Sequence, residues 1–98
     1  MEKSTPHCKL ERVRHLIGAG RVRMTVSAVA GASALGLDPA AMLAIVAGLV
    51  PHDFYKSMTT HADHTIWQDV YQPVTPYGGV YLKLTVIDDL LIVSFKER

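Results

Sequence analysis

The sequence contains a single cysteine, Cys8, among its 98 residues. No internal disulfide can form, and a lone thiol fits a reducing compartment, so we expect a cytoplasmic location. A signal peptide is not expected, because the N-terminal residues are polar and are interrupted by Pro6. Residues 26–50 carry one charge, but Asp38-Pro39 divides them into two runs that are each too short to span a bilayer. We expect two buried helices there and no membrane partner.

Charge of either sign is scarce, at 19% of residues, and the formal net charge is only +1. The net charge therefore argues neither for nor against a nucleic acid partner. The charge is unevenly distributed, since residues 1–50 sum to +3 and residues 51–98 to −2. This asymmetry is a modest indication of a basic face for an anionic partner. A solvated helix face explains it equally well.

Length and composition indicate one globular domain over residues 1–98, with a thin core. Helical spacing dominates the first half. Thr5-Pro6 predicts the start of a helix whose apolar residues end before Gly18, and Ser27 predicts the cap of a second helix over 28–35. Asp38-Pro39 predicts a third helix that ends at Pro51. Residues 21–25 fit either a short strand or an extended connector.

The hydrophobic period changes from 3.6 to 2 in the second half of the chain. We predict strands over 54–60, 65–72, 80–87 and 90–96, joined as an antiparallel meander. Residues 73–79 are predicted to be a loop containing a turn with proline at its second position, Thr75-Pro76-Tyr77-Gly78. Helices packed on one face of this sheet make an α+β fold of two layers.

Alternation along the last two strands assigns side chains to the two faces of the sheet. Tyr81 and Lys83 are predicted to face away from the helices, opposite Val80, Leu82, Leu84 and Val86. In the last strand we expect Leu91, Val93 and Phe95 to face the helices, with Ser94 and Lys96 facing out and Leu90 and Ile92 as apolar exceptions. In the two earlier strands, periodicity would make Lys56 and Gln68 partly buried.

Several long segments resemble the MqsR toxins, an mRNA-cleaving branch of the RelE-like group of bacterial toxin–antitoxin systems. They are Asp53-Phe54-Tyr55-Lys56-Ser57-Met58-Thr59-Thr60, Asp63-His64-Thr65-Ile66-Trp67-Gln68-Asp69-Val70-Tyr71, Val80-Tyr81-Leu82-Lys83 and Ile92-Val93-Ser94-Phe95-Lys96. The N-terminal Met1-Glu2-Lys3 and Thr5-Pro6-His7 also fit, and the similarity covers essentially the whole chain. The resemblance implies a RelE-like two-layer fold.

The resemblance also implies the toxin of a type II toxin–antitoxin module, a ribosome-independent endoribonuclease that cuts mRNA at short, GCU-type sequences. It implies no metal or other cofactor and inhibition by a cognate zinc-binding, MqsA-like antitoxin, through which alone DNA would be contacted. The family's catalytic residues fall on Lys56, Gln68 and Tyr81. Lys83, Lys96 and Arg23 are predicted to bind RNA.

Metal-free RNA cleavage uses the ribose 2′-OH as nucleophile, so it needs a base, an acid and positive charge for the phosphorane. We expect clustered cations and partial burial to lower the pKa of Lys56, which would make it a base or an electrostatic stabiliser. Tyr81 could exchange a proton, and Gln68 could orient the RNA. Without the family resemblance, Lys56 fits a surface lysine equally well, and Tyr81 fits an ordinary cross-strand aromatic better than a catalytic residue.

Other polar and aromatic residues have structural interpretations that we prefer. His61 and His64 around Asp63 are read as loop residues rather than metal ligands, although one could assist proton transfer. Trp67 is read as packing rather than as a base-stacking surface.

The alternative function is a non-catalytic module of the same fold that binds RNA or the antitoxin. The joint presence of the three catalytic residue types favours the enzyme.

Overall fold

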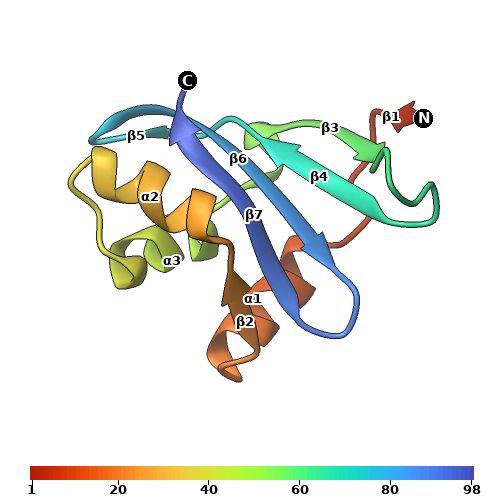
Figure 1. Cartoon of the computed structure of the whole chain (residues 1–98), viewed down its shortest axis with the longest axis horizontal. Helices are drawn as coiled ribbons and strands as arrows, with labels where there is room; N and C mark the ends of the chain where they lie inside the picture. The colour runs from red at the N-terminus through yellow and green to blue at the C-terminus, as the bar shows by residue number, and fades with distance from the viewer.

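The computed structural model describes residues 1–98 as three α-helices and an open β-sheet (Figure 1), which confirms the α+β prediction. In chain order the elements are β1 (Glu2–Lys3), α1 (Leu10–Gly18), β2 (Val22–Met24), α2 (Val26–Ala34), α3 (Pro39–Ala47), β3 (Phe54–Thr59), β4 (Trp67–Tyr71), β5 (Val74–Thr75), β6 (Gly78–Val86) and β7 (Leu90–Glu97). A single 3-10 turn, Pro51–Asp53, joins α3 to β3.

The sheet has the strand order β1-β3-β4-β6-β7-β2. Its four central strands, β3, β4, β6 and β7, pair antiparallel in chain order, which confirms the predicted meander. Both edge strands come from the N-terminal half of the chain: β1 pairs antiparallel with β3, and β2 pairs parallel with β7. Residues 22–24 are therefore a strand. The predicted loop over 73–79 is partly wrong, because β5 pairs with the start of β6 around the predicted proline turn.

The helix caps confirm one prediction and correct two. Asp38 caps α3 as expected, since its carboxylate accepts a hydrogen bond from the backbone N–H of Ala41 at 2.8 Å. The cap of α2 is Thr25 and not Ser27, because the Thr25 hydroxyl accepts from Ala28. The first helix begins at Leu10 and not at Pro6. A tertiary contact described below holds the preceding residues extended, and it overrides the local cap-and-proline signal.

The three helices cover one face of the sheet and form a single core with it. Its fully buried side chains come from both layers, and they include Leu16, Met42, Val46, Tyr71, Leu82, Leu84, Leu90, Ile92 and Phe95. Arg14 of α1 fixes the layer of helices by donating hydrogen bonds to the carbonyls of Ala47 and Leu49. No single helix is long and apolar enough to cross a membrane, and α2 and α3 reach that length and apolarity only as a pair bent by 94°.

A β-bulge reverses the predicted faces of the first part of β7 and leaves the faces of Ser94, Phe95 and Lys96 as predicted. Phe95 is buried as predicted, but Leu90 and Ile92 are fully buried too, whereas Leu91 and Val93 are only partly buried. The pairing with β6 shifts between Lys83, opposite Ser94, and Leu84, opposite Ile92, so that Val93 is the extra residue. An extra residue inverts the alternation on one side of it. The interpretation of Leu90 and Ile92 as exceptions was therefore wrong.

Candidate active site

Strand register places Lys56 and Lys83 in one row on the sheet face away from the helices. Lys56 pairs with Val70, Val70 with Lys83, and Lys83 with Ser94. Directly paired residues point to the same side of a sheet. Val70 is 0% exposed although it is not part of the helix-covered core. We call this surface, which carries Lys56, Gln68, Tyr81, Lys83 and Lys96, the open face.

Tyr81 is surrounded by cations on the open face. It pairs directly with Lys96 of β7, whose Nζ atom lies 5.3 Å from the centre of the tyrosine ring. The Nζ atom of Lys83, two residues along β6, lies 6.0 Å from the same ring. These two ammonium groups favour the binding of an anion beside Tyr81, and a phosphate is the best match.

Gln68 lies on the other side of the central row. It pairs with Met58 and precedes Val70 by two residues, so its side chain is also on the open face. Two residues along a strand span about 6.6 Å, which places Gln68 and Tyr81 on opposite flanks of Lys56 and Lys83. The structure therefore brings the three sequence-predicted catalytic residues onto one surface with two of the three predicted RNA-binding residues, but not into one tight cluster.

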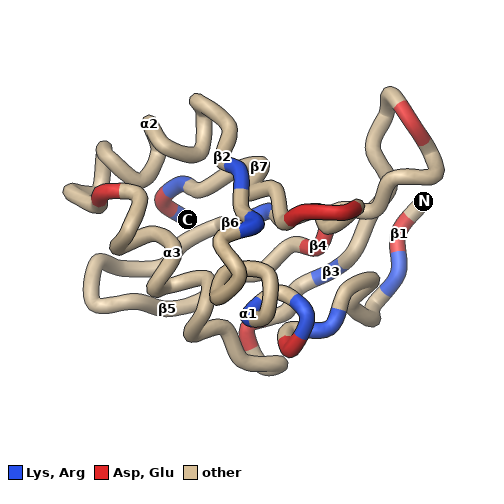
Figure 2. The backbone as a smooth tube through the Cα atoms, turned by 90° about the horizontal axis from the view of Figure 1, so that it is seen from below, with Lys and Arg blue, Asp and Glu red and all other residues tan.

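Arg23 stands apart from this group. It pairs with Leu91 at the β2 edge, and the alternation of Val22 and Met24 toward the core puts Arg23 on the open side. Four strand spacings of about 4.8 Å separate β2 from β3, so the backbones of Arg23 and Lys56 are about 19 Å apart. Figure 2 shows basic residues both on this sheet and on α1. Arg23 can contact only a part of an RNA chain remote from Lys56.

Sequence reasoning missed Glu2. In β1 it pairs with Met58, and its Oε1 atom lies 2.6 Å from Nζ of Lys56, whose side chain is 27% exposed. The hydrogen bond from Lys56 lowers the pKa of Glu2 and raises the pKa of Lys56. The expectation of a lowered pKa for Lys56 is therefore wrong. A two-residue strand is too short to show an alternation of polar and apolar residues, so the sequence around Glu2 does not predict this pair.

Lys83 has the lowered pKa instead. Burial of its side chain is the first cause, and the positive charges of Lys96 and Lys56 add to it. The open face thus holds one lysine whose charge is stabilised by a carboxylate and another whose charge is destabilised. The opposite shifts in pKa suit the two lysines to different tasks. Lys56 is suited to hold a negatively charged group, and Lys83 is better able to exchange a proton.

We expect Lys83 to titrate below the usual lysine range and Lys56 above it. Replacing Glu2 with glutamine removes the charged acceptor, so the pKa of Lys56 should fall while that of Lys83 moves less. Lysine side-chain NMR shifts followed through an alkaline titration measure both. The lysine side chain of an unstructured peptide serves as the reference. An unchanged Lys56 titration in Glu2→Gln would contradict the pairing in solution.

The opposite side of β4 is structural, as we inferred for Trp67. The Trp67 ring stacks on His7 with a centroid separation of 5.6 Å, and Nζ of Lys3 lies 4.1 Å from its centre. The carboxylate of Asp69, only 4% exposed, accepts hydrogen bonds from the backbone N–H groups of His7 and Cys8, each at 2.9 Å. These contacts tie the segment between β1 and α1 to the sheet. They are the tertiary restraint that delays the start of α1.

The histidines of the β3–β4 connection are exposed loop residues, as inferred. Between them, Asp63 accepts hydrogen bonds from the backbone N–H and the hydroxyl of Thr65, at 2.8 and 2.6 Å. This carboxylate is engaged in shaping the loop. The thiol of Cys8 is partly buried, and burial, followed by the charge of Asp69, raises its pKa. A raised pKa disfavours the reactive thiolate.

Comparison with known proteins identifies the family of this chain. Residues 5–97 match the family described as "Motility quorum-sensing regulator, toxin of MqsA". A curated relative, the mRNA interferase toxin MqsR of Escherichia coli (strain K12), is 59% identical over 98 residues, which is 100% of both chains. A match of this extent, together with the α+β fold, means that the chain belongs to the MqsR toxin family.

Proposed function

We propose that this chain is the toxin of a type II toxin–antitoxin module and that it cleaves mRNA endonucleolytically on the open face. The observation that carries the proposal is the convergence of Lys56, Tyr81, Lys83 and Lys96 on one uncovered surface. The naming of its 59% identical relative as an mRNA interferase supports the reaction class. An mRNA substrate also supports the cytoplasmic location that the lone cysteine suggests.

The proposed chemistry is an attack of the ribose 2′-OH on the adjacent phosphorus. A P–O2′ bond forms, the P–O5′ bond breaks, and the products are a 2′,3′-cyclic phosphate and a 5′-hydroxyl. One proton leaves the 2′-OH and one reaches the departing 5′-oxygen. The scheme uses no metal, because lysine charge would stabilise the phosphorane. It also needs no ribosome, because all of its catalytic groups come from this chain.

The pKa directions favour a division of labour on the open face. Lys56 remains an ammonium and would stabilise the charge of the phosphorane. Lys83, with its lowered pKa, would accept the 2′-OH proton. Tyr81 would donate to the 5′-oxygen with Lys96 holding a phosphate beside it, and the Gln68 amide would orient the RNA from the opposite flank.

The decisive experiment is cleavage of a defined RNA in EDTA, with and without GCU sites, followed by mapping of both new ends. We expect discrete cuts at the GCU sites, carrying a 2′,3′-cyclic phosphate and a 5′-hydroxyl. A single 2′-deoxy substitution on the 5′ side of the cut should abolish that cut alone. If folded protein leaves the RNA intact, the chain is instead a binding module of the same fold.

The family description also names a partner, since it presents the toxin as that of MqsA. We accordingly propose a cognate, zinc-binding antitoxin that inhibits this chain by binding it. Any contact with DNA would be made by the antitoxin and not by this domain.

A further inference from the structure

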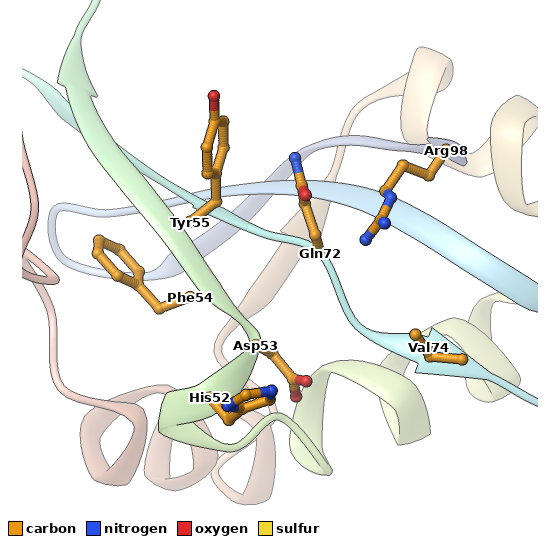
Figure 3. Close-up of a pocket in the computed structure, with 7 residues that line it drawn as sticks. All are labelled: His52, Asp53, Phe54, Tyr55, Gln72, Val74 and Arg98. Carbon is orange, nitrogen blue, oxygen red and sulfur yellow. The ribbon is translucent and has the colours of Figure 1, made fainter.

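A pocket of about 380 Å³ lies beside the open face, within the size range of about 300–1,000 Å³ that small ligands occupy. Its lining residues come from segments far apart in the sequence: His52, Asp53, Phe54, Tyr55, Gln72, Val74 and Arg98. In Figure 3, the side chains of Tyr55 from β3 and Gln72 from the end of β4 point the same way, and the Arg98 side chain extends toward Gln72 from the end of β7. None of these three carries a role in the proposed cleavage.

Strand register makes this pocket continuous with the proposed active site. Tyr71 pairs with Leu82, so the next residues outward, Gln72 and Tyr81, are neighbours on the open face. Arg98 follows Lys96 by two residues and shares its face. Gln72 and Arg98 therefore lie within reach of a nucleotide that adjoins a phosphate bound at Tyr81 and Lys96.

Arg98 is positioned by the backbone of Gly79. Its N–H donates to the Gly79 carbonyl at 2.9 Å, and its side chain lies along the space that Gly79 leaves by having no Cβ. A Cβ placed on Gly79 would be 3.5 Å from Cβ and 3.8 Å from Nε of Arg98. The guanidinium forms no ion pair with any residue of the chain, so its charge is free for a phosphate.

Tyr55 supplies an exposed aromatic surface at the other wall of the pocket. The pairing of β3 with β4 shifts between Phe54 and Lys56, so Tyr55 points outward while Phe54 packs edge-on against Tyr71. Tyr55 is 54% exposed, and Nζ of Lys56 lies 5.4 Å from the centre of its ring. An exposed ring next to a cation is the combination on which single-stranded RNA bases stack.

We propose that this pocket binds the nucleotide adjacent to the scissile phosphate of single-stranded RNA. Tyr55 stacks on its base, Arg98 contacts its phosphate, and the Gln72 amide, which is both donor and acceptor, hydrogen-bonds to the edge of the base. The pocket thereby extends RNA recognition by one defined position. This inference rests on the proposed function in placing the scissile phosphate beside Lys56 and Tyr81.

The test uses short RNAs that contain the cleavage site, made resistant by a 2′-deoxy sugar at the cut, with a single abasic site moved along the chain. Dissociation constants are measured by fluorescence anisotropy for wild type, Tyr55→Leu and Arg98→Ala over a series of salt concentrations. For wild type, we expect removal of the base at one position flanking the cut to weaken binding about tenfold. Tyr55→Leu should bind the intact RNA about tenfold more weakly than the wild type does. For this variant, removal of that same base should not weaken binding further.

Arg98→Ala should act differently from Tyr55→Leu. Loss of one phosphate contact should reduce the slope of log affinity against log salt by about 0.7, whereas Tyr55→Leu should leave the slope unchanged. Arg12→Ala is the matched control, because Arg12 is an exposed arginine on α1 outside the open face. It should preserve both affinity and slope.

Two results would overturn the subsite. The first is that Tyr55→Leu weakens the binding of every abasic RNA by the same factor, wherever the abasic site lies. The second is that Arg98→Ala has the same slope of log affinity against log salt as the wild type. Cleavage of intact RNA by the wild type is scored separately. Cutting without the Tyr55 coupling overturns the subsite and leaves the proposed function in place. Coupling without cutting shows that the pocket binds an RNA base, but it overturns the nuclease and with it the placement of that base beside a scissile phosphate.

Discussion

Replacing Lys56 with alanine is expected to lower the single-turnover rate of RNA cleavage by about 100- to 1,000-fold, the usual cost of removing one preorganised stabiliser of transition-state charge. The fold should be retained, because the Lys56 side chain lies on the open face outside the core. Quenched-flow or gel measurement with enzyme in excess reports the chemical step directly. The Lys9→Ala variant, which removes an exposed lysine at the start of α1, should cleave at the wild-type rate.

The Glu2 carboxylate complicates this experiment. In Lys56→Ala it loses its partner and adds an uncompensated negative charge where the RNA binds. Part of the loss could then be repulsion of the substrate. The double variant Glu2→Gln/Lys56→Ala removes that charge, so it should recover RNA affinity but not the rate at saturating enzyme. If the double variant recovers the rate as well, Lys56 only offsets Glu2 and does not stabilise the transition state.

The open face was largely predictable from the sequence, because β6 alternates strictly between apolar and polar residues. Leu82 and Leu84 had to meet the helices, so Tyr81 and Lys83 had to face away. Lys96 was also predicted to face away from the helices, and its direct antiparallel pairing with Tyr81 is the structure's addition. The family resemblance, and not the pattern, singled out Lys56 and Gln68, since their strands carry apolar residues on both faces.

What could not be predicted depends on contacts between residues far apart in the sequence. The extra residue at Val93 inverts the faces of Leu90 and Ile92, and a second register shift turns Tyr55 outward. Neither shift leaves a local signature, because each is defined only by its partner strand. The Glu2–Lys56 pair likewise depends on a two-residue edge strand. All three lie at or next to the proposed RNA-binding surface.

The Ala- and Gly-rich helix α2 packs closely on β7, and Gly31 shows how closely. A Cβ atom on Gly31 of α2 would lie 1.8 Å from the carbonyl oxygen and 3.0 Å from the carbonyl carbon of Phe95 in β7. Both obstacles are backbone atoms, so no side-chain rotation can relieve the clash. We expect Gly31→Ala to reduce the free energy of unfolding by about 3 kcal/mol, the upper end of ordinary overpacking costs. For a domain of this size, the midpoint of thermal unfolding should fall by about 12–24 °C.

This prediction runs against helix propensity, which favours alanine over glycine inside a helix by about 1 kcal/mol. Gly18→Ala is the matched control: Gly18 is also helical, but nothing lies within 4 Å of its would-be Cβ, so that variant should be as stable as wild type or more so. Calorimetry or urea unfolding of the two variants compares them directly. Equal stabilities would mean that α2 can move away from β7 at little cost. Because Lys96 follows Phe95 and faces Tyr81 on the other side of the strand, such freedom would also loosen the proposed active site. A destabilised Gly31→Ala protein would instead show that this close helix–strand contact holds the strand on which Lys96 is presented.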